Sequence, residues 1–440
     1  MSDYFEETEY TLERVWFDYL DGHYVGRGIM RWKPHRGFHL DAFLGRRGPP
    51  LPPRIDVGKV RVVGEREMRS IRMKPEGYDW AIETARLTDR VDLTVQDRLS
   101  LDLASVLFCR KEEDAPTSAG WGSALLATGA KPKMPDTVET EERLGGKMVR
   151  KKYALGGISY GDEVVTLVGR PVGDSTVELS WKLAPGTDAR RQSWGWAIAF
   201  RDALSIVSGH GVVLLQRTLR RGPYEFVEVR RRENVESLGL ITLVDPGPAV
   251  DKRLLARLAQ FLVRGGETAT VCRAVFNQAL EAARQKSWQA TELLLSTILE
   301  AALRTLDNHP FKSGDYSWEI DKSMERFRQR YLSDDWREAC QQALDVHRRL
   351  RHRNAHPDWL HRGGGALSDE EMSKALDDMV FLGRFYGYMI LALAGFEGLG
   401  PVFPRPHREW GPSLTIHTEN QAGGPPAEDR ACQDSASAAD

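Results

Sequence analysis

The spacing of hydrophobic and polar positions divides the chain into two regions. Up to about residue 245, apolar residues alternate with polar ones or form short β-branched runs, which end at turn sequences such as "DG" at 21–22 and "RPVGD" at 170–174. A period of two is typical of strands with one buried face. We therefore predict a β-rich domain over residues 1–245, with one helix at 194–207 and strands at 10–18, 24–32, 57–64, 91–97, 163–169, 176–182, 212–218 and 224–230.

The period becomes helical after "VDPGPAV" at 244–250. From residue 251 onward the apolar residues fall on one helical face, beginning with Leu254, Leu255, Leu258, Phe261 and Leu262. This pattern predicts an all-α bundle over residues 251–396, with further helices at 268–285, 287–307, 320–331, 334–355 and 368–394. The fold class is therefore α+β, with a β-rich N-terminal domain followed by a helical bundle.

The ends of the last predicted helix also carry signals. Ser368 followed three residues later by Glu371 forms a capping box, which predicts a helix start. The apolar stretch at 379–395 is interrupted by Arg384 and is shorter than the roughly 20 residues of a membrane span, so we expect a buried helix. Residues 401–440 are rich in Pro, Gly, Ser and Asp, and we expect a disordered tail.

Composition narrows the class of protein but not its partners. The chain of 440 residues is 41% hydrophobic and 28% charged, as in soluble globular proteins, and its 61 basic and 63 acidic side chains nearly cancel. The cysteines have neither zinc-site nor disulfide-framework spacing, and the acidic N-terminus lacks a secretory signal. We expect a cytoplasmic protein with no membrane partner and with reduced thiols at Cys109, Cys272, Cys340 and Cys432.

Three local sequences are weak candidates for catalysis or binding. "GISYG" at 157–161 fits a nucleophile elbow with Ser159, but the residues that follow predict a strand where that motif needs a helix, so a hairpin turn is favoured. The glycine-rich "GWGSALLATGAK" at 120–131 lacks the spacing of a phosphate loop. His352 and His356 have i, i+4 spacing, but no third ligand is evident, so we predict no metal site.

The strongest local feature is "RRLRHRNAHPDWLHR" at 348–362, which holds five Arg and three His around one Asp. It contains an Arg-x4-His pair, Arg351 and His356. The spacing alone means little, because roughly one such pair is expected by chance and a second exists in Arg304 and His309. Arg304 lies among core-like positions, whereas Arg351 lies in a basic segment able to attract a phosphate backbone.

"LRHRNAHP" at 350–357 resembles the signature of HEPN domains, in particular the ApeA-like HEPN proteins of bacterial defence systems. That signature is an Arg, a polar residue, three further residues and a His, near the end of a long helix in a small bundle. The resemblance covers about 251–396. The stretch "GHYVGRGIMRWKPHRGFHLDAF" at 22–43 is loosely similar to the β-rich N-terminal domain of these proteins. His352 stands where Asn is more usual, and Asn354 follows later.

The resemblance implies a ribonuclease that is an anti-phage, abortive-infection effector and acts as a homodimer on RNA, such as the loops of tRNA. It implies an N-terminal domain that senses a trigger, for which a phage product is one candidate, and it implies no cofactor. Arg351 and His356 would be catalytic, and the supporting and RNA-binding residues would be His352, Asn354, Arg348, Arg349 and Arg353.

The residue types fit this chemistry independently. RNA supplies its own nucleophile, the 2′-hydroxyl, so cleavage needs a base, an acid and positive charge on the phosphate, but no metal. His transfers protons near neutral pH, and the Arg fork pairs two phosphate oxygens. Residues five apart on an ideal helix differ by about 140° in direction, but Pro357 disfavours helical geometry at His356 and so favours a bend toward Arg351.

Two alternatives stay open. The bundle could be a non-catalytic HEPN domain that binds a nucleotide, RNA or a protein partner. The basic segment could also be only a solvated helix face, since charged runs usually are.

Overall fold

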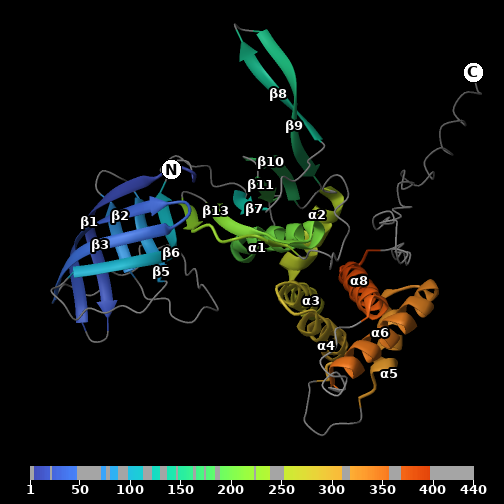
Figure 1. Ribbon diagram of the computed structural model, residues 1–440. Coiled ribbons are helices and arrows are strands. Elements are labelled where there is room, and N and C mark those ends of the chain that lie inside the picture. The colour runs from blue at the N-terminus through green and yellow to red at the C-terminus, as the bar shows by residue number, and fades with distance from the viewer. Residues whose placement is uncertain are drawn as a thin grey trace, which may run out of the picture. The chain divides into compact units, whose positions relative to one another are not determined.

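The computed structural model describes most of the chain. The described residues are 4–19, 22–46, 71–75, 80–87, 98–111, 121–128, 136–144, 147–161, 165–172, 175–183, 189–221, 224–237, 252–309, 318–355 and 368–396. They show a mixed α+β protein with two compact units (Figure 1). One comprises 1–240 with 245–269, and the other comprises 241–244 with 270–440.

Six antiparallel strands of the first unit form a closed ring. They follow the order β3-β2-β1-β4-β5-β6, and β3 also pairs with β6, which closes the ring. Side chains alternate across it: Leu40, Ala42 and Leu44 of β3 are buried, whereas Phe43 between them is exposed. The strands are β1 (Thr8–Tyr19), β2 (Gly22–Lys33), β3 (Gly37–Arg46), β4 (Ile71–Pro75), β5 (Trp80–Leu87) and β6 (Arg98–Lys111).

The sheet continues beyond the ring, because β6 also pairs with β14. The order from there is β14-β13-β7-β11-β10-β9-β8. Helix α1 (Ala189–Ser208) contacts β7 and β13, and α2 (Lys252–Arg264) packs on α1. The strands are β7 (Trp121–Ala127), β8 (Asp136–Leu144), β9 (Lys147–Gly161), β10 (Val165–Pro171), β11 (Thr176–Leu183), β13 (Val213–Arg221) and β14 (Tyr224–Arg230), with a separate pair formed by β12 (His210–Gly211) and β15 (Glu236–Ser237).

Large aromatic side chains fill the space between α1 and the sheet. The rings of Trp181 and Trp196 each lie 5.4 Å from that of Phe200, and all three side chains are buried. Gly122 of β7 leaves room for Trp181, since a Cβ there would lie 2.4 Å from the indole. The side of α1 that carries Trp196 and Phe200 therefore covers the sheet.

The second unit is helical. Its elements are α3 (Glu267–Ala283), α4 (Trp288–Leu306), α5 (Ile320–Tyr331), the 3-10 helix η1 (Asp334–Trp336), α6 (Arg337–Ala355) and α8 (Asp369–Leu393). Helix α4 contacts α5, α6 and α8, and α6 contacts α5 and α8. The Cys272 thiol of α3 donates to the Ile390 carbonyl of α8 at 3.7 Å, and the buried ring of Trp336 meets Tyr388 edge-on at 4.6 Å.

The predicted terminal helix is confirmed. Ser368 and Glu371 form the capping box in both directions, and nearly all of α8 from Phe381 to Leu393 is buried. No helix among the described residues is long and apolar enough to cross a membrane. The predicted tail at 401–440 lies outside the described residues.

The predicted domain boundary differs from the observed division. We placed the helix that begins after residue 251 in the bundle, but α2 belongs to the first unit because its apolar face packs on α1. The sequence pattern shows that α2 is amphipathic, but not which partner buries its face.

Most of the predicted strands lie where the pattern placed them. Those at 10–18, 24–32, 163–169, 176–182, 212–218 and 224–230 correspond to β1, β2, β10, β11, β13 and β14, and the helix at 194–207 lies within α1. The predictions at 57–64 and 91–97 lie outside the described residues. Strands β3 to β9 were missed; β7, for example, is buried at nearly every position and therefore does not alternate.

Candidate active site at the end of helix α6

The basic segment 348–355 lies at the end of α6 and contacts α4, α5 and α8. The backbone of Arg353 and Asn354 is helical, but their side chains are not among those described. His356 and Pro357 lie outside the described residues, so the juxtaposition of Arg351 with His356 stays a prediction. His352 is exposed.

Arg351 is held by a carboxylate of a neighbouring helix. Its Nη1 donates to Glu300 of α4, and its side chain is nevertheless 58% exposed. Glu300 is 17% exposed and also accepts from Arg304 Nε at 3.1 Å. One carboxylate thus faces two guanidinium groups, those of Arg304 and Arg351.

Arg348 and Arg349 have different surroundings, although they are adjacent in sequence. Arg348 donates to Asp321 of α5 and to Asp345, and all three side chains are about half exposed. Arg349 donates to both oxygens of Asp378 of α8, at 2.7 and 3.3 Å, and the Asp378 side chain is only 8% exposed. The hydrogen bond with Asp378 raises the pKa of Arg349 further.

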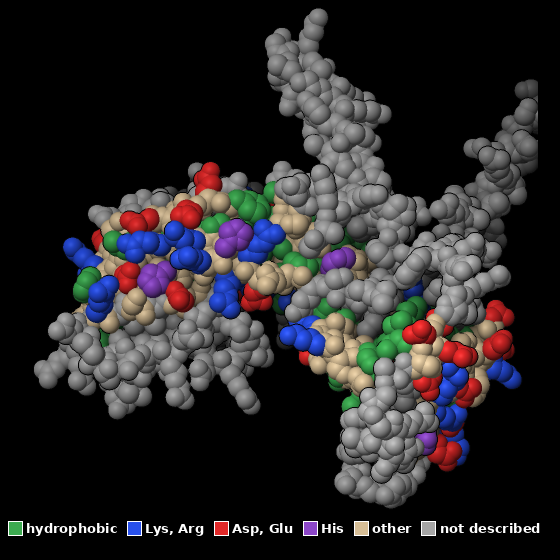
Figure 2. All heavy atoms as spheres, viewed as in Figure 1, with side chains coloured by type: hydrophobic (Ala, Val, Ile, Leu, Met, Phe, Trp, Pro, Cys, Tyr) green, Lys and Arg blue, Asp and Glu red, His purple; other side chains and the backbone are tan. Residues whose placement is uncertain are grey.

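These ion pairs change the electrostatic interpretation of the basic segment. Arg348 and Arg349, predicted to bind RNA, each pair with carboxylates inside the unit, and Arg349 joins α6 to α8. Figure 2 shows acidic and basic side chains interspersed on the visible face of the helical unit. Arg351 is also paired, but it shares its carboxylate, Glu300, with Arg304 and is the most exposed of these three arginines.

Arg304, of the second Arg-x4-His pair, is packed against other side chains of the helical unit. The Arg304 side chain is 12% exposed, and its guanidinium lies over the ring of Trp318 at 4.1 Å, beside Glu300. Its surroundings agree with the core-like pattern that distinguished it from Arg351.

Two residues of this region were not singled out from the sequence. His347 is buried, and its Nδ1 lies 2.7 Å from the Ser296 carbonyl, so a neutral imidazole donates there. Burial lowers the pKa of His347. Glu300 carried only the signal of an ordinary i, i+4 pair with Arg304, and nothing in the sequence links it to Arg351, fifty-one residues later.

Two of the weaker candidates form strands, and the third, His352 with His356, includes a residue outside the described part of the chain. Ser159 lies within β9, which pairs with β10, so the predicted hairpin turn at "GISYG" is wrong: these residues form the strand before the turn. The glycine-rich stretch at 120–131 contains the whole of β7. Within the described residues, no three His, Cys, Asp or Glu side chains gather as metal ligands would.

Comparison of the chain with protein-family models, curated proteins and solved structures finds no match. The interpretation of this site consequently depends on its residues and their geometry.

Proposed function

We propose that this protein is a metal-independent endoribonuclease whose catalytic groups are Arg351 and His356. The observation that carries the proposal is the state of Arg351: its guanidinium is anchored by Glu300, a carboxylate that it shares with Arg304, and its side chain is nevertheless 58% exposed. An anchored, accessible guanidinium can bind a phosphate with little loss of side-chain entropy.

The proposed reaction needs only groups of the protein and of the RNA. His356 removes the proton of a 2′-hydroxyl, whose oxygen attacks the adjacent phosphorus while the bond to the 5′-oxygen breaks. A second His returns a proton to that 5′-oxygen, and the products are a 2′,3′-cyclic phosphate and a free 5′-hydroxyl. Arg351 stabilises the negative charge that develops on the phosphate oxygens.

A homodimer accounts for the two His groups. One imidazole cannot easily serve as base and acid on opposite sides of an in-line attack, and each chain offers one His in this motif. A symmetric dimer that brings the two α6 ends together would provide two His and two Arg. Exposed loops of structured RNA are the expected substrate, because in-line attack needs a flexible backbone.

The resemblance to ApeA-like HEPN proteins extends this proposal to biology. It supports a cytoplasmic anti-phage effector in which the helical unit is a HEPN bundle and the β-rich unit responds to a trigger. A non-catalytic binding bundle is the second candidate, and one observation favours it: carboxylates of the same unit already pair with Arg348 and Arg349.

A labelled tRNA distinguishes the two candidates. The purified full-length protein should convert it, in the presence of EDTA, into fragments that end in 2′,3′-cyclic phosphate. Binding without such fragments would favour the non-catalytic candidate.

A further inference from the structure

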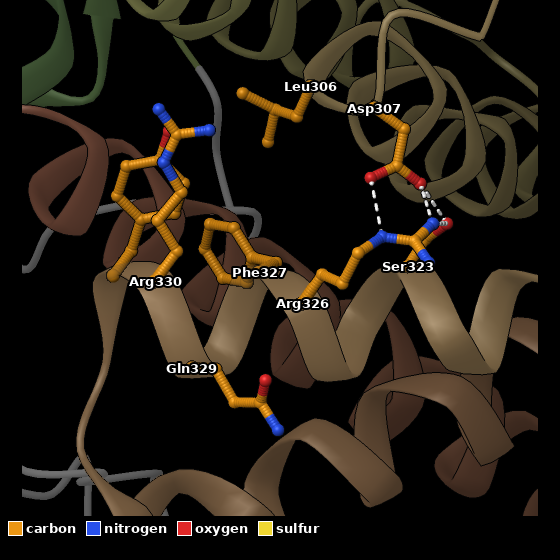
Figure 3. Close-up of a pocket in the computed structure, with 8 residues that line it drawn as sticks. Leu306, Asp307, Ser323, Arg326, Phe327, Gln329 and Arg330 are labelled. Atoms are coloured by element: carbon orange, nitrogen blue, oxygen red, sulfur yellow. Dashed lines mark hydrogen bonds and ion pairs between the residues drawn. The ribbon is translucent and has the colours of Figure 1, made fainter.

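A pocket of about 370 Å³ lies where the end of α4 meets α5. Its volume is within the range of small-ligand sites. Figure 3 shows that Asp307 and Arg326 point toward each other on one side, while Arg330 lies on the other, beyond Phe327. The residues that line it are Leu306, Asp307, Ser323, Arg326, Phe327, Gln329, Arg330 and Tyr331.

The acidic wall of the pocket is neutralised by its neighbours. Asp307 accepts from Arg326 Nε at 3.1 Å, from Arg326 Nη2 at 2.5 Å and from the Trp318 indole at 3.1 Å. Ser323 donates to the same carboxylate. Burial would raise the pKa of Asp307, but these hydrogen bonds lower it below its ordinary value. Asp307 is therefore a fixed anion that Arg326 already balances.

The opposite wall combines a cation with aromatic surface. Arg330 is exposed, its guanidinium lies 5.2 Å from the centre of the Tyr331 ring, and no ion pair among the described residues involves it. The ring of Phe327 lies 5.4 Å from that of Tyr331. An aromatic ring beside an exposed guanidinium suits a planar group that carries a phosphate.

The pocket and Arg351 are connected through one face of α4. Glu300, Arg304 and Asp307 have i, i+4, i+7 spacing, which places them in a row along that face. Glu300 binds Arg351 at one end of the row, and Asp307 borders the pocket at the other. Seven residues of helix span about 10 Å, so one bound strand of RNA could reach both places.

We propose that this pocket binds an unpaired nucleotide of the RNA, with its base against the half-buried Tyr331, which Phe327 backs from the core, and its phosphate on Arg330. The inference rests on the proposed function, because it takes RNA as the substrate, and it adds a subsite beside the cleaved bond. Since the base must leave its helix to enter, the subsite would favour loops over duplex.

Binding of an RNA hairpin with a 2′-O-methylated loop tests the subsite without cleavage. Fluorescence anisotropy with the full-length protein should show that Tyr331→Ala weakens binding by about 5- to 100-fold, as loss of one stacked base does, while Tyr331→Phe binds normally. Arg330→Ala should weaken binding roughly 10-fold and reduce the salt slope by about 0.7. Lys322→Ala removes an exposed charge from the same helix, outside the pocket. It should change neither the affinity for the hairpin nor the dependence of that affinity on salt.

The outcomes separate the subsite from the proposed function. If Arg330→Ala and Tyr331→Ala bind the hairpin as the unmodified protein does, the subsite is wrong, whether or not RNA is cleaved. If free AMP displaces the hairpin and binds as tightly as the hairpin does, the pocket is a site for a free nucleotide and the RNA assignment is overturned. If the pocket variants lose binding but no RNA is ever cleaved, the subsite stands and the ribonuclease proposal fails.

Discussion

Truncation of the adjacent residues Arg348 and Arg349 should change the stability of the protein by different amounts. Arg349→Ala removes the partner of Asp378, whose side chain is 8% exposed and accepts two hydrogen bonds. A buried carboxylate left without its partner costs about 1–3 kcal/mol. Because Arg349 itself is 41% exposed and water can reach its place, we expect about 1–2 kcal/mol of lost stability.

Arg348→Ala is the matched control. Its two carboxylate partners are 53% and 47% exposed, and pairs of this kind contribute about 0–1 kcal/mol and are screened by salt. Urea unfolding monitored by circular dichroism gives the free energy of unfolding for both variants. Adding Asp378→Asn to Arg349→Ala should recover part of the loss, since the stranded charge is removed.

Equal stabilities for the two variants would refute this reasoning. That result, combined with equal losses of RNA affinity, would mean that both arginines serve the surface predicted from the sequence and that the contact with Asp378 contributes nothing to the fold.

Three further predictions concern the same unit. Burial depresses the pKa of His347, so the unfolded state binds the proton more readily and the free energy of unfolding should fall as the pH drops below the ordinary value of 6.5. In His347→Gln, the midpoint of urea unfolding should depend less on pH between pH 5 and 7.5 than it does in the unmodified protein. His356→Ala should lower the RNA cleavage rate by about 10²- to 10⁴-fold, whereas His309→Ala should leave it nearly intact; equal losses in folded variants would mean that the site is misplaced. Sedimentation should show a dimer, and full activity of a strict monomer at nanomolar concentration would exclude the composite site.

The helical region was predictable from sequence because its signals are local. A capping box, an apolar face and a flanking proline or glycine all lie in or next to a single helix. The predicted ends of α4, α5 and α8 accordingly differ from the observed ones by at most one residue. The strands were harder, because their pairing joins distant residues. The ring closes through β3 and β6, and no local pattern shows that Phe38 lies opposite Leu103.

In the candidate site, too, the local features were predictable from the sequence and the contacts between distant residues were not. The basic segment and the Arg-x4-His spacing are visible in sequence, but the carboxylates that pair with it come from three other helices. Glu300, Asp321 and Asp378 each have an ordinary helical context, so only the fold shows that they restrain the arginines. The sequence therefore predicted a broadly basic surface where the structure pairs Arg348, Arg349 and Arg351 with carboxylates of other helices.

Cleavage of an RNA with a single 2′-deoxy substitution tests the central claim most directly. The cleaved nucleotide is first mapped in EDTA with the unmodified protein, and the same RNA is then made with hydrogen in place of that one 2′-hydroxyl. We predict that cleavage at this position stops completely, because the nucleophile is gone, and that Arg351→Lys fails on the unmodified RNA, because Lys lacks the planar fork. Continued cleavage of the deoxy substrate, or loss of cleavage of the unmodified RNA in EDTA, would contradict the account and indicate water activated by a metal.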